Sequence, residues 1–425
     1  MNKIALIACL SSKNWYSFAP LFASLENTSL YQTYDVFILK KRKITEIKQM
    51  VDQYETNLFA YSFYTHESPA ISAELKQIRA HFHPEKAILL AGGSHASGNP
   101  KQSLQMGFDL IVRGEGERTF PLLLERIRNE ENYFDLPGLC YWRDNHPYIS
   151  NPSQLLNLDK TSTFSRRFNL YPPLEISRGC PYGCKYCEVS YLFGKTMKHR
   201  SITAILEIVK AYKKIFTIRR KTDIRFISPN SLAYGSDGRN PKPEILQKLL
   251  KSIHDLGVRI YFATFPSETR PEFITPSVLE AITPYISNNQ IAFGAQSGSD
   301  KILKLIGRQH TIDDILNAVT NILDFNLTPL VDFLLGLPGE ELEDQYHTLE
   351  LIKELIKNKR AKIRIHYFMP LAGSPFENTK SVPIDSAILS ELGRFAKKGH
   401  LQGNLNTQIK NSMKIQDFLQ RFTDI

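Results

Sequence analysis

The sequence predicts an α/β protein with three parts: an N-terminal doubly wound sheet, a partial barrel of six strand–helix units and a helical C-terminal extension. Short apolar runs alternate with amphipathic stretches in both halves of the chain, which is the pattern of parallel strands covered by helices. Between the halves, prolines and asparagines interrupt every long period. The 425 residues also exceed what one hydrophobic core usually organises. We therefore expect domains at 1–130 and 171–375, a linker at 131–170 and the extension at 376–425.

The first domain contains five apolar runs that we expect to be strands. They are Lys3–Cys9, Tyr34–Leu39, Asn57–Phe63, Lys86–Ala91 and Asp109–Val112. Helical patterns lie between them, such as Ile44–Tyr54 and Ser68–His81. Five such units fit an open, Rossmann-like sheet, whose ligands bind beyond the carboxyl ends of the strands.

The linker is expected to hold a short hairpin near Leu139–Tyr148, and six more units follow it. Their strands are Leu174–Ser177, Ile224–Ser228, Arg259–Thr264, Gln290–Ala295, Pro329–Leu335 and Lys362–Phe368. Helices are expected at Ile202–Lys214, Pro243–Leu256, Pro276–Ile286, Ile312–Phe325 and Glu343–Lys357. This pattern predicts a partial or complete TIM-like (β/α) barrel, with its reactive residues at the carboxyl ends of the strands. The extension is polar and mostly helical, and it suggests no function of its own.

The composition is that of an ordinary folded protein, with 42% hydrophobic and 23% charged residues. No run of about 18 apolar residues is present, so we expect no membrane span. The apolar start, Met1–Leu10, fits a first strand better than a signal peptide, and a cytoplasmic location is expected. The net charge of +10, densest at Lys213–Arg225, fits a solvated face or an acidic partner. No RNA-binding fingerprint or zinc-finger spacing points to nucleic acid.

Three of the five cysteines lie in a C-x3-C-x2-C loop directly after the first barrel strand: Cys180, Cys184 and Cys187. Thiolates at this spacing suit an iron–sulfur cluster or zinc. Three ligands on a four-iron cube leave one iron open for a bound molecule, whereas a structural zinc needs a fourth ligand that the sequence does not offer. The remaining two, Cys9 and Cys140, are expected to be small buried hydrophobic residues.

This loop, with Tyr186 just before its last cysteine, resembles that of the radical S-adenosylmethionine (SAM) superfamily, and the resemblance covers roughly 170–375. It implies a [4Fe–4S] cluster on the three cysteines, whose open iron chelates the amino and carboxylate groups of SAM. Tyr186 would lie against the adenine. An external one-electron reductant, such as flavodoxin or ferredoxin, would drive cleavage of SAM to a 5′-deoxyadenosyl radical.

Later segments resemble the rest of that family's SAM pocket. Ser228 and Asn230 end the second strand, where the family contacts the SAM amino group. The segment from Gln296 to Arg308 resembles the QSGS…R segment of methylthiotransferases and cobalamin-type radical SAM enzymes. The resemblance implies ribose contacts from Gln296, Ser297 and Ser299, a carboxylate contact from Arg308 and an adenine contact from the backbone near Leu337. Ser267–Pro271 would line the same mouth, either in contact with SAM or substrate or as a structural ion pair.

Two glycine segments of the first domain, GG-x-H and RGEGE, resemble the cobalamin-binding domain that precedes some radical SAM barrels. The residues implied to surround the nucleotide tail and the corrin rim are Ser62, Phe63, Gly92, Gly93, His95, Glu115, Gly116 and Glu117. The alternatives are a flavodoxin-like domain without its ligand and, for His95, a helix cap. The D-x-H-x-x-G motif that ligates cobalt is absent after the first strand, so we predict no histidine below the cobalt. Asn14, Trp15 or Tyr16 could face that side.

These features predict a cobalamin-dependent radical SAM methyltransferase that acts on an unactivated carbon. It would release one S-adenosylhomocysteine and one 5′-deoxyadenosine per turnover. A cobalamin-dependent cyclase or rearrangement enzyme, a methylthiotransferase and a non-catalytic sensor are the alternatives; a methylthiotransferase needs three further N-terminal cysteines. The substrate is expected to be a peptide, a lipid or a small metabolite. No substrate-side catalytic residue is predicted, because the cofactor performs the hydrogen abstraction.

Overall fold

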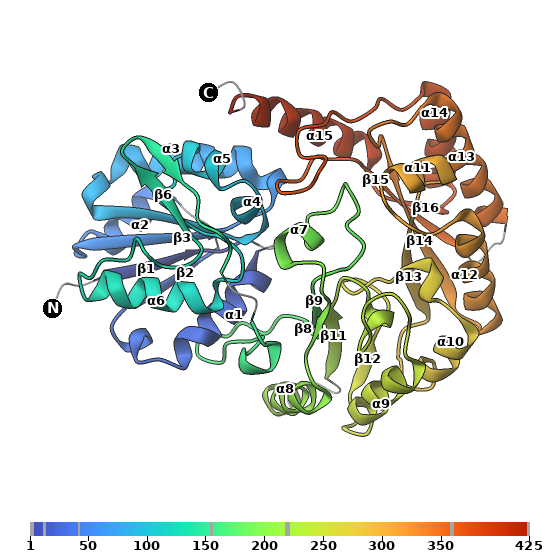
Figure 1. Ribbon diagram of the computed structural model, residues 1–425, viewed down its shortest axis with the longest axis horizontal. Coiled ribbons are helices and arrows are strands. Elements are labelled where there is room, and N and C mark those ends of the chain that lie inside the picture. Colours follow the sequence, from blue (N-terminus) through green and yellow to red (C-terminus); the bar gives the residue numbers. More distant parts are fainter. Residues whose placement is uncertain are drawn as a thin grey trace. The chain divides into compact units, whose positions relative to one another are not determined.

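The computed structural model describes residues 4–11, 14–40, 43–153, 156–216, 222–357 and 361–422. It divides into two compact units (Figure 1). Unit 1 comprises 1–172, 371–374 and 417–425, and unit 2 comprises 173–370 and 375–416. Residues 12 and 13 of the predicted cobalt-facing loop, and 217–221 of the basic run, lie outside the described residues.

Unit 1 is built on a seven-stranded sheet in the order β2-β1-β3-β4-β5-β6-β7. Its five parallel strands are β1 (Ile4–Cys9), β2 (Asp35–Leu39), β3 (Thr56–Ser62), β4 (Ala87–Gly92) and β5 (Leu110–Val112). The chain winds outward in both directions from β1 and β3. The topological switch point therefore lies between these two strands, which is where doubly wound sheets bind their ligands. This confirms the predicted doubly wound fold.

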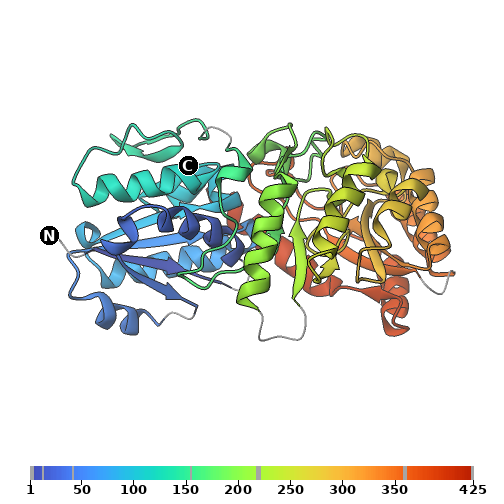
Figure 2. The ribbon, with the colours of Figure 1, turned by 90° about the horizontal axis from the view of Figure 1, so that it is seen from below.

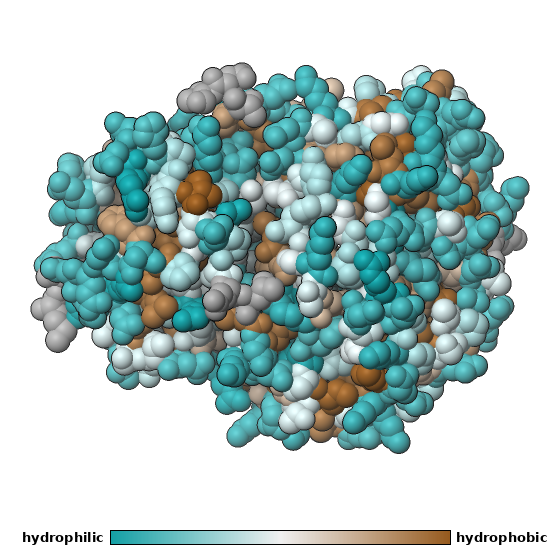
Figure 3. All heavy atoms as spheres, in the orientation of Figure 1, coloured by the Kyte–Doolittle hydropathy of each residue, from teal (hydrophilic) through white to brown (hydrophobic). Residues whose placement is uncertain are grey.

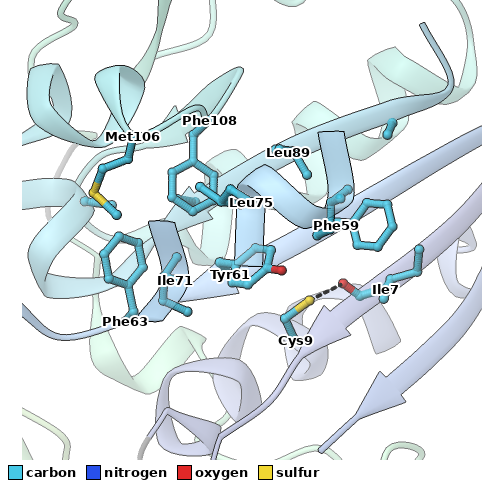
Figure 4. Packing of buried hydrophobic residues seen from close by; sticks show 14 of the residues in the cluster. Ile7, Cys9, Phe59, Tyr61, Phe63, Ile71, Leu75, Leu89, Met106 and Phe108 are labelled. Atoms are coloured by element: carbon cyan, nitrogen blue, oxygen red, sulfur yellow. Dashed lines mark hydrogen bonds between the residues drawn. The ribbon is translucent and has the colours of Figure 1, made fainter. Parts of the chain in front are cut away.

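Helices cover both faces of this sheet, because alternate strand residues point to opposite sides. One core contains Leu6 and Leu58 and lies under α1 (Trp15–Glu26) and α6 (Gly116–Arg128). The other contains Ile7 and Phe59, as Figure 4 shows. It lies under α2 (Ile44–Val51), α3 (Ser68–His81), α4 (Gly93–Gly98) and α5 (Pro100–Gln105). The central strands β1, β3 and β4 are buried on both faces, which explains why their runs are largely apolar, whereas β2 at the margin of the sheet is only partly buried.

The predicted linker and extension differ from what the structure contains. The expected hairpin is present as β6 (Leu139–Arg143) and β7 (His146–Tyr148), but β6 pairs with β5 and so extends the sheet of unit 1. The boundary after 130 was therefore wrong, and unit 1 runs to 172. The chain returns to unit 1 twice, at 371–374 and at the end of α15 (Leu405–Gln420), where Phe418 enters the hydrophobic core.

Unit 2 contains the six predicted parallel strands with helices outside them (Figures 1 and 2). The strands are β8 (Leu174–Glu175), β11 (Asp223–Ile227), β12 (Arg259–Tyr261), β13 (Gln290–Gln296), β14 (Thr328–Leu335) and β15 (Lys362–Tyr367). The helices are α8 (Ile202–Ile215), α9 (Pro243–His254), α10 (Pro276–Ile282), α12 (Ile312–Asp324), α13 (Leu342–Lys357) and α14 (Ser386–Lys397). A parallel bridge between Thr269 and Phe293 links the two halves of the sheet. A seventh strand, β16 (Leu401–Gln402), comes from the predicted extension and pairs with β15.

Hydrophilic residues dominate the face in Figure 3, and the apolar residues on it form small groups. Among the described residues, no helix combines the length and the apolar character needed to cross a bilayer.

Candidate functional site

The cysteine loop leaves the barrel at the carboxyl end of β8 and passes through β9 (Ser177–Arg178), which pairs with β10 (Lys198–His199). Gly179 has a φ of +88°, and a Cβ there would lie 2.2 Å from the Thr196 carbonyl oxygen, so only glycine fits this turn. The loop is then held at both ends. The Cys180 N–H donates to the Gly194 carbonyl (3.1 Å), and the Lys185 N–H donates to the Ile306 carbonyl (2.9 Å).

The three cysteines of this loop lie together, with Cys184 buried and the other two half-buried. Burial is the main reason why the pKa of Cys187 rises to about 12, and the nearby Cys184 and Cys180 raise it further. Within the described part of the chain, no three His, Cys, Asp or Glu side chains converge to hold a single metal ion. A four-iron cube does not require such convergence, because each cysteine binds a different iron. Three thiolates from one loop fit three irons of such a cube.

Polar atoms without partners gather after β11. The hydroxyls of Ser228 and Ser231 and the Nδ2 of Asn230 are buried and have no hydrogen-bond partner among the described residues. The Asn230 Oδ1 accepts a 2.6 Å hydrogen bond from the Thr269 hydroxyl, which fixes the orientation of the amide. Buried polar groups are nearly always paired, so these atoms fit a polar ligand such as the amino acid part of SAM. Ser231 was not predicted, since a second serine in such a turn carries no sequence signal.

Arg308, which follows α11 (Asp300–Leu305), is a second incompletely satisfied group. It is buried, its Nη2 donates to the Gly294 carbonyl (2.7 Å), and its Nε has no hydrogen-bond partner in the part of the chain that the structure describes. In the described part of the chain it has no carboxylate at ion-pair distance, and its electrostatic neighbours are Tyr186, Cys184 and, farther away than an ion pair, Glu272. A buried guanidinium of this kind fits the carboxylate of a bound ligand.

Gln296 is held at the barrel mouth by an irregular backbone. The pairing of β13 with β14 shifts register between Gly294 and Gln296, and Gln296 has a φ of +73°. A Cβ on Gly294 would lie 2.0 Å from the Gln296 Nε2, so the glycine makes room for this side chain. Backbone strain of this kind often occurs at binding sites.

The other residues predicted to contact the ribose make different contacts. The Ser299 hydroxyl donates to Asp344 on α13 (2.7 Å) and caps α11, and the Ser297 hydroxyl lies 3.4 Å from that of Thr348. Both serines are buried. Their hydroxyls attach the end of β13 to α13, and the predicted ribose contacts of Ser297 and Ser299 stay predictions.

The backbone at Leu337 is also occupied. Glu340 Oε2 accepts from the N–H groups of Gly336 (2.8 Å) and Leu337 (3.1 Å), and the Leu337 carbonyl accepts from the Glu340 N–H (3.1 Å). An adenine contact could use only the second lone pair of that carbonyl. Burial raises the pKa of Glu340 to about 7, although its two N–H donors oppose the rise.

Of the two alternatives for Ser267–Pro271, the structure contains the ion pair: Arg270, which is buried, pairs with Glu272. His310, which sequence reasoning missed, completes the group. Its Nδ1 lies 3.7 Å from Glu272 Oε2, and its Nε2 lies 3.1 Å from the Ala295 carbonyl oxygen. Burial, together with Arg308 and Arg270, lowers the pKa of His310 to about 2 and keeps the ring neutral.

A polar cluster spans the interior of the barrel. Arg364 on β15 donates to both carboxylate oxygens of Asp332 on β14 (2.7 and 2.5 Å) and to Glu268, which follows β12 (2.6 Å). Because β13 and β14 separate β12 from β15, the contact with Glu268 must cross the lumen. TIM barrel interiors are usually filled by branched apolar side chains. The partly exposed charges here indicate a lumen that accepts polar groups.

Asn14 lies at the switch point of unit 1. Its Nδ2 donates to the carbonyls of Cys9 (3.0 Å) and Ser62 (2.8 Å), and its Oδ1 accepts from the Ser11 N–H (2.7 Å). The amide therefore joins the carboxyl ends of β1 and β3 and is fully used. Both amide hydrogens of Asn14 are thus used within the protein, and the prediction that Trp15 or Tyr16 could face cobalt stays a prediction.

Phe63 and His95 are core residues in this structure. The His95 ring is completely buried against Phe63, with centroids 5.0 Å apart, and its Nδ1 lies 3.1 Å from the Thr65 hydroxyl. Burial lowers its pKa to about 3, so the ring is neutral. The side chain neither caps α4 nor presents itself to a ligand. Its main chain nevertheless ties the two loops, because the His95 N–H donates to the Phe63 carbonyl (3.2 Å).

The glycine segments bring the loops at the edge of the sheet together. Gly93 has a φ of +81°, and a Cβ there would lie 2.3 Å from the Ser62 hydroxyl. Gly92 ends β4, and Gly116 begins α6. Glu115 and Glu117 are buried, and a Glu115 oxygen accepts from the Leu156 N–H. The main chain of Gly92, Gly93 and Gly116, which were predicted to contact cobalamin, thus lies at this edge. The Glu115 side chain holds the segment after β7.

Cys9 and Cys140 are fully buried in the same hydrophobic core of unit 1, as predicted. Burial raises the pKa of the Cys140 thiol. Neither side chain is placed to bind a second cluster.

Residues 174–370 match the family model of the radical SAM superfamily. Together with the cysteine loop and the barrel, this match identifies unit 2 as a radical SAM domain and the protein as a radical SAM enzyme. Its cofactors in that class are a [4Fe–4S] cluster and SAM. Over most of its length the chain also has the fold of radical SAM enzymes solved with cobalamin.

Two solved structures illustrate the likeness. The radical SAM methyltransferase TsrM from Kitasatospora setae, with cobalamin and [4Fe–4S] cluster bound, has a TM-score of 0.68 at 12% identity, over 90% of this chain and 76% of that one. The cobalamin-dependent enzyme OxsB, with aqua-cobalamin bound, has a TM-score of 0.63 at 16% identity, over 94% and 56%.

Two curated relatives are more similar in sequence. An uncharacterized protein of Methanocaldococcus jannaschii is 25% identical over 80% of this chain and 74% of its own length. A tRNA-2-methylthio-N(6)-dimethylallyladenosine synthase of Petrotoga mobilis is 31% identical over 47% of this chain and 44% of its own length.

Proposed function

We propose that this chain is a cobalamin-dependent radical SAM methyltransferase that methylates an unactivated carbon. The observation that carries the proposal is the presence in one chain of a parallel sheet in the order β2-β1-β3-β4-β5 and a radical SAM barrel. The likeness to TsrM and OxsB extends over 90% or more of the chain and so includes unit 1. Both of those structures contain cobalamin.

In this proposal the residues of unit 2 hold the radical source. Cys180, Cys184 and Cys187 bind the cluster, and Arg308, with the polar atoms after β11, orients the amino acid part of SAM. When bound and reduced, the cluster and SAM supply a 5′-deoxyadenosyl radical that abstracts hydrogen from the substrate. A small electron-transfer protein such as flavodoxin or ferredoxin would deliver the electron.

In unit 1 the edge of the sheet would hold cobalamin. Gly92, Gly93 and Gly116 are partly exposed there, and helix N-termini favour phosphate groups. Asn14 and His95 are buried beneath the loops at this edge. In this proposal they are structural residues and not ligands. The lumen cluster of Asp332, Arg364 and Glu268 favours a peptide or polar metabolite as substrate over a lipid.

A methylthiotransferase is the alternative that the synthase of Petrotoga mobilis raises. The burial of Cys9 and Cys140 argues against it, because those enzymes need a second cluster on three N-terminal cysteines. A cobalamin-dependent cyclase or rearrangement enzyme remains the main competitor.

Anaerobic reconstitution with iron, sulfide and hydroxocobalamin, followed by SAM and a reductant, tests the proposal. Methyl transfer requires S-adenosylhomocysteine and 5′-deoxyadenosine in equal amounts per turnover; 5′-deoxyadenosine alone would favour the cyclase. Cys184→Ala should lose the cluster and SAM cleavage while it retains cobalamin. The matched control is Cys140→Ala, which removes a buried thiol from unit 1. This variant should retain both SAM cleavage and cobalamin binding. A protein that binds no cobalamin would contradict the proposal.

A further inference from the structure

We propose that Arg270 is a positioning residue that directs a charged N–H group at the sulfur of Cys184 and thereby raises the reduction potential of the cluster. The proposal concerns the radical SAM cluster alone. It holds whether the enzyme transfers a methyl group or performs another radical reaction.

Each nitrogen of the Arg270 guanidinium has its own partner. The Nε donates to Glu272, the Nη2 donates to the main-chain carbonyl of Arg308, and the Nη1 lies 4.0 Å from Cys184 Sγ. The first two contacts fix the plane of the group, so the third nitrogen has no freedom to turn away. The fork geometry of arginine is what allows one side chain to make all three contacts.

Tyr182 of the cysteine loop covers one face of the Arg270 guanidinium. The Arg270 Cζ lies 3.4 Å from the centroid of the Tyr182 ring, which belongs to the same loop as Cys184. Arg270 is 3% exposed, and Cys184 is 6% exposed, so water screens their interaction little. The ion pair with Glu272 orients the arginine, but the carboxylate meets the Nε and not the nitrogen that faces the sulfur.

The effect on the cluster follows from charge. Reduction adds an electron to a cluster held by three thiolates, and a buried cation beside one of them stabilises the reduced form more than the oxidised form. Hydrogen bonds to ligand sulfurs act in the same direction. Removal of Arg270 should therefore lower the midpoint potential and make the first electron harder to deliver.

The experiment uses the reconstituted full chain and compares Arg270→Gln, Arg270→Lys and Arg239→Gln with the wild type. Arg239 is a matched control, because its guanidinium also lies over the Tyr182 ring, 5.6 Å from the centroid, but it is exposed and donates to Gln309 and to the Pro181 carbonyl instead of a cysteine sulfur. The readouts are iron and sulfide content, the midpoint potential from an EPR-monitored redox titration, and the thermal midpoint of the apo protein.

We expect a more negative midpoint potential in Arg270→Gln, a smaller shift in Arg270→Lys, and the wild-type value in Arg239→Gln. A full cluster with an unchanged potential in Arg270→Gln would overturn the proposal. If Arg270→Gln assembles no cluster, the thermal midpoint of the apo protein distinguishes a role at the cluster from a structural role. An unchanged thermal midpoint supports a role at the cluster, whereas a large fall in that midpoint, shared by Arg270→Lys, assigns Arg270 a purely structural role and refutes the proposal.

Discussion

The side-chain amide of Asn14 donates a 2.8 Å hydrogen bond to the main-chain carbonyl of Ser62. Since Asn14 opens α1 and Ser62 ends β3, this bond joins the two loops that flank the switch point of unit 1. The proposed cobalamin site therefore depends on an asparagine that does not itself face the ligand.

Asn14→Ala should destabilise unit 1. The change removes the three hydrogen bonds that the Asn14 amide makes with Cys9, Ser62 and Ser11, which corresponds to a loss of about 1 to 3 kcal/mol in the free energy of unfolding. Urea unfolding of the apo protein measures this loss in the free energy of unfolding. Asn27→Ala, at the exposed end of α1, is the control and should change stability by less than about 0.5 kcal/mol. Equal effects of the two variants would contradict the assigned role.

Bound cobalamin should have no histidine nitrogen below the cobalt. The loop after β1, residues 10–17, contains no histidine, and Asn14 uses all its amide hydrogen bonds within the protein. The cob(II)alamin EPR spectrum should be the same whether histidine is labelled with ¹⁴N or ¹⁵N. A change in superhyperfine splitting between the two samples would identify a histidine ligand and refute the prediction.

Glu340 should make stability fall between weakly acidic and neutral pH. Its folded-state pKa of about 7 lies above the ordinary value of 4.5, so the folded protein retains a proton that the unfolded chain has released. Its contribution is complete below about pH 4.5 and is lost as the pH rises through about 7. Glu340→Gln should flatten this part of the pH profile, measured by chemical unfolding. An unchanged slope would show that another group causes the dependence.

Asp332→Ala should leave Arg364 with Glu268 as its remaining carboxylate partner. Loss of one partner from a largely buried pair costs about 3 to 5 kcal/mol, and partial exposure of Arg364 reduces this to about 2 to 3 kcal/mol. Adding Arg364→Met should recover part of the loss, because the guanidinium that has lost one of its two carboxylate partners is gone. A double-mutant cycle by urea unfolding tests this, and strictly additive losses would rule out the coupling.

Gly98→Ala should displace the segment 371–374 from unit 1. A Cβ on Gly98 would lie 2.3 Å from the Ala372 carbonyl oxygen, while the Ala372 N–H donates to the Thr65 hydroxyl (3.2 Å). Amide hydrogen exchange at Ala372 should therefore accelerate. Gly393→Ala is the control, since a Cβ there meets nothing within 4 Å and the residue lies in α14. Protection of Ala372 that survives Gly98→Ala would contradict this docking.

The parts of the fold that were predictable are those with a local signal. The strands of both units, helices such as α3, and the cysteine loop followed from apolar periodicity and cysteine spacing, because both patterns are set by neighbours in sequence. The prediction of a linker was wrong because it relied on the local pattern alone. A hairpin has the same local pattern whether it stands alone or pairs with β5.

The sequence by itself determined the class of chemistry, since three cysteines at fixed spacing and the segments after them have few other uses. Only the tertiary structure decided which polar side chains remain available to a ligand. Ser299 meets Asp344, 45 residues away, and Thr65 meets Ala372, 307 residues away, and no local pattern records such partners. A buried polar group takes whatever partner the fold brings to it, because leaving it unpaired costs more than most single contacts contribute. Asn14 and His95 are therefore structural, while Arg308 and the polar atoms after β11 remain incompletely paired.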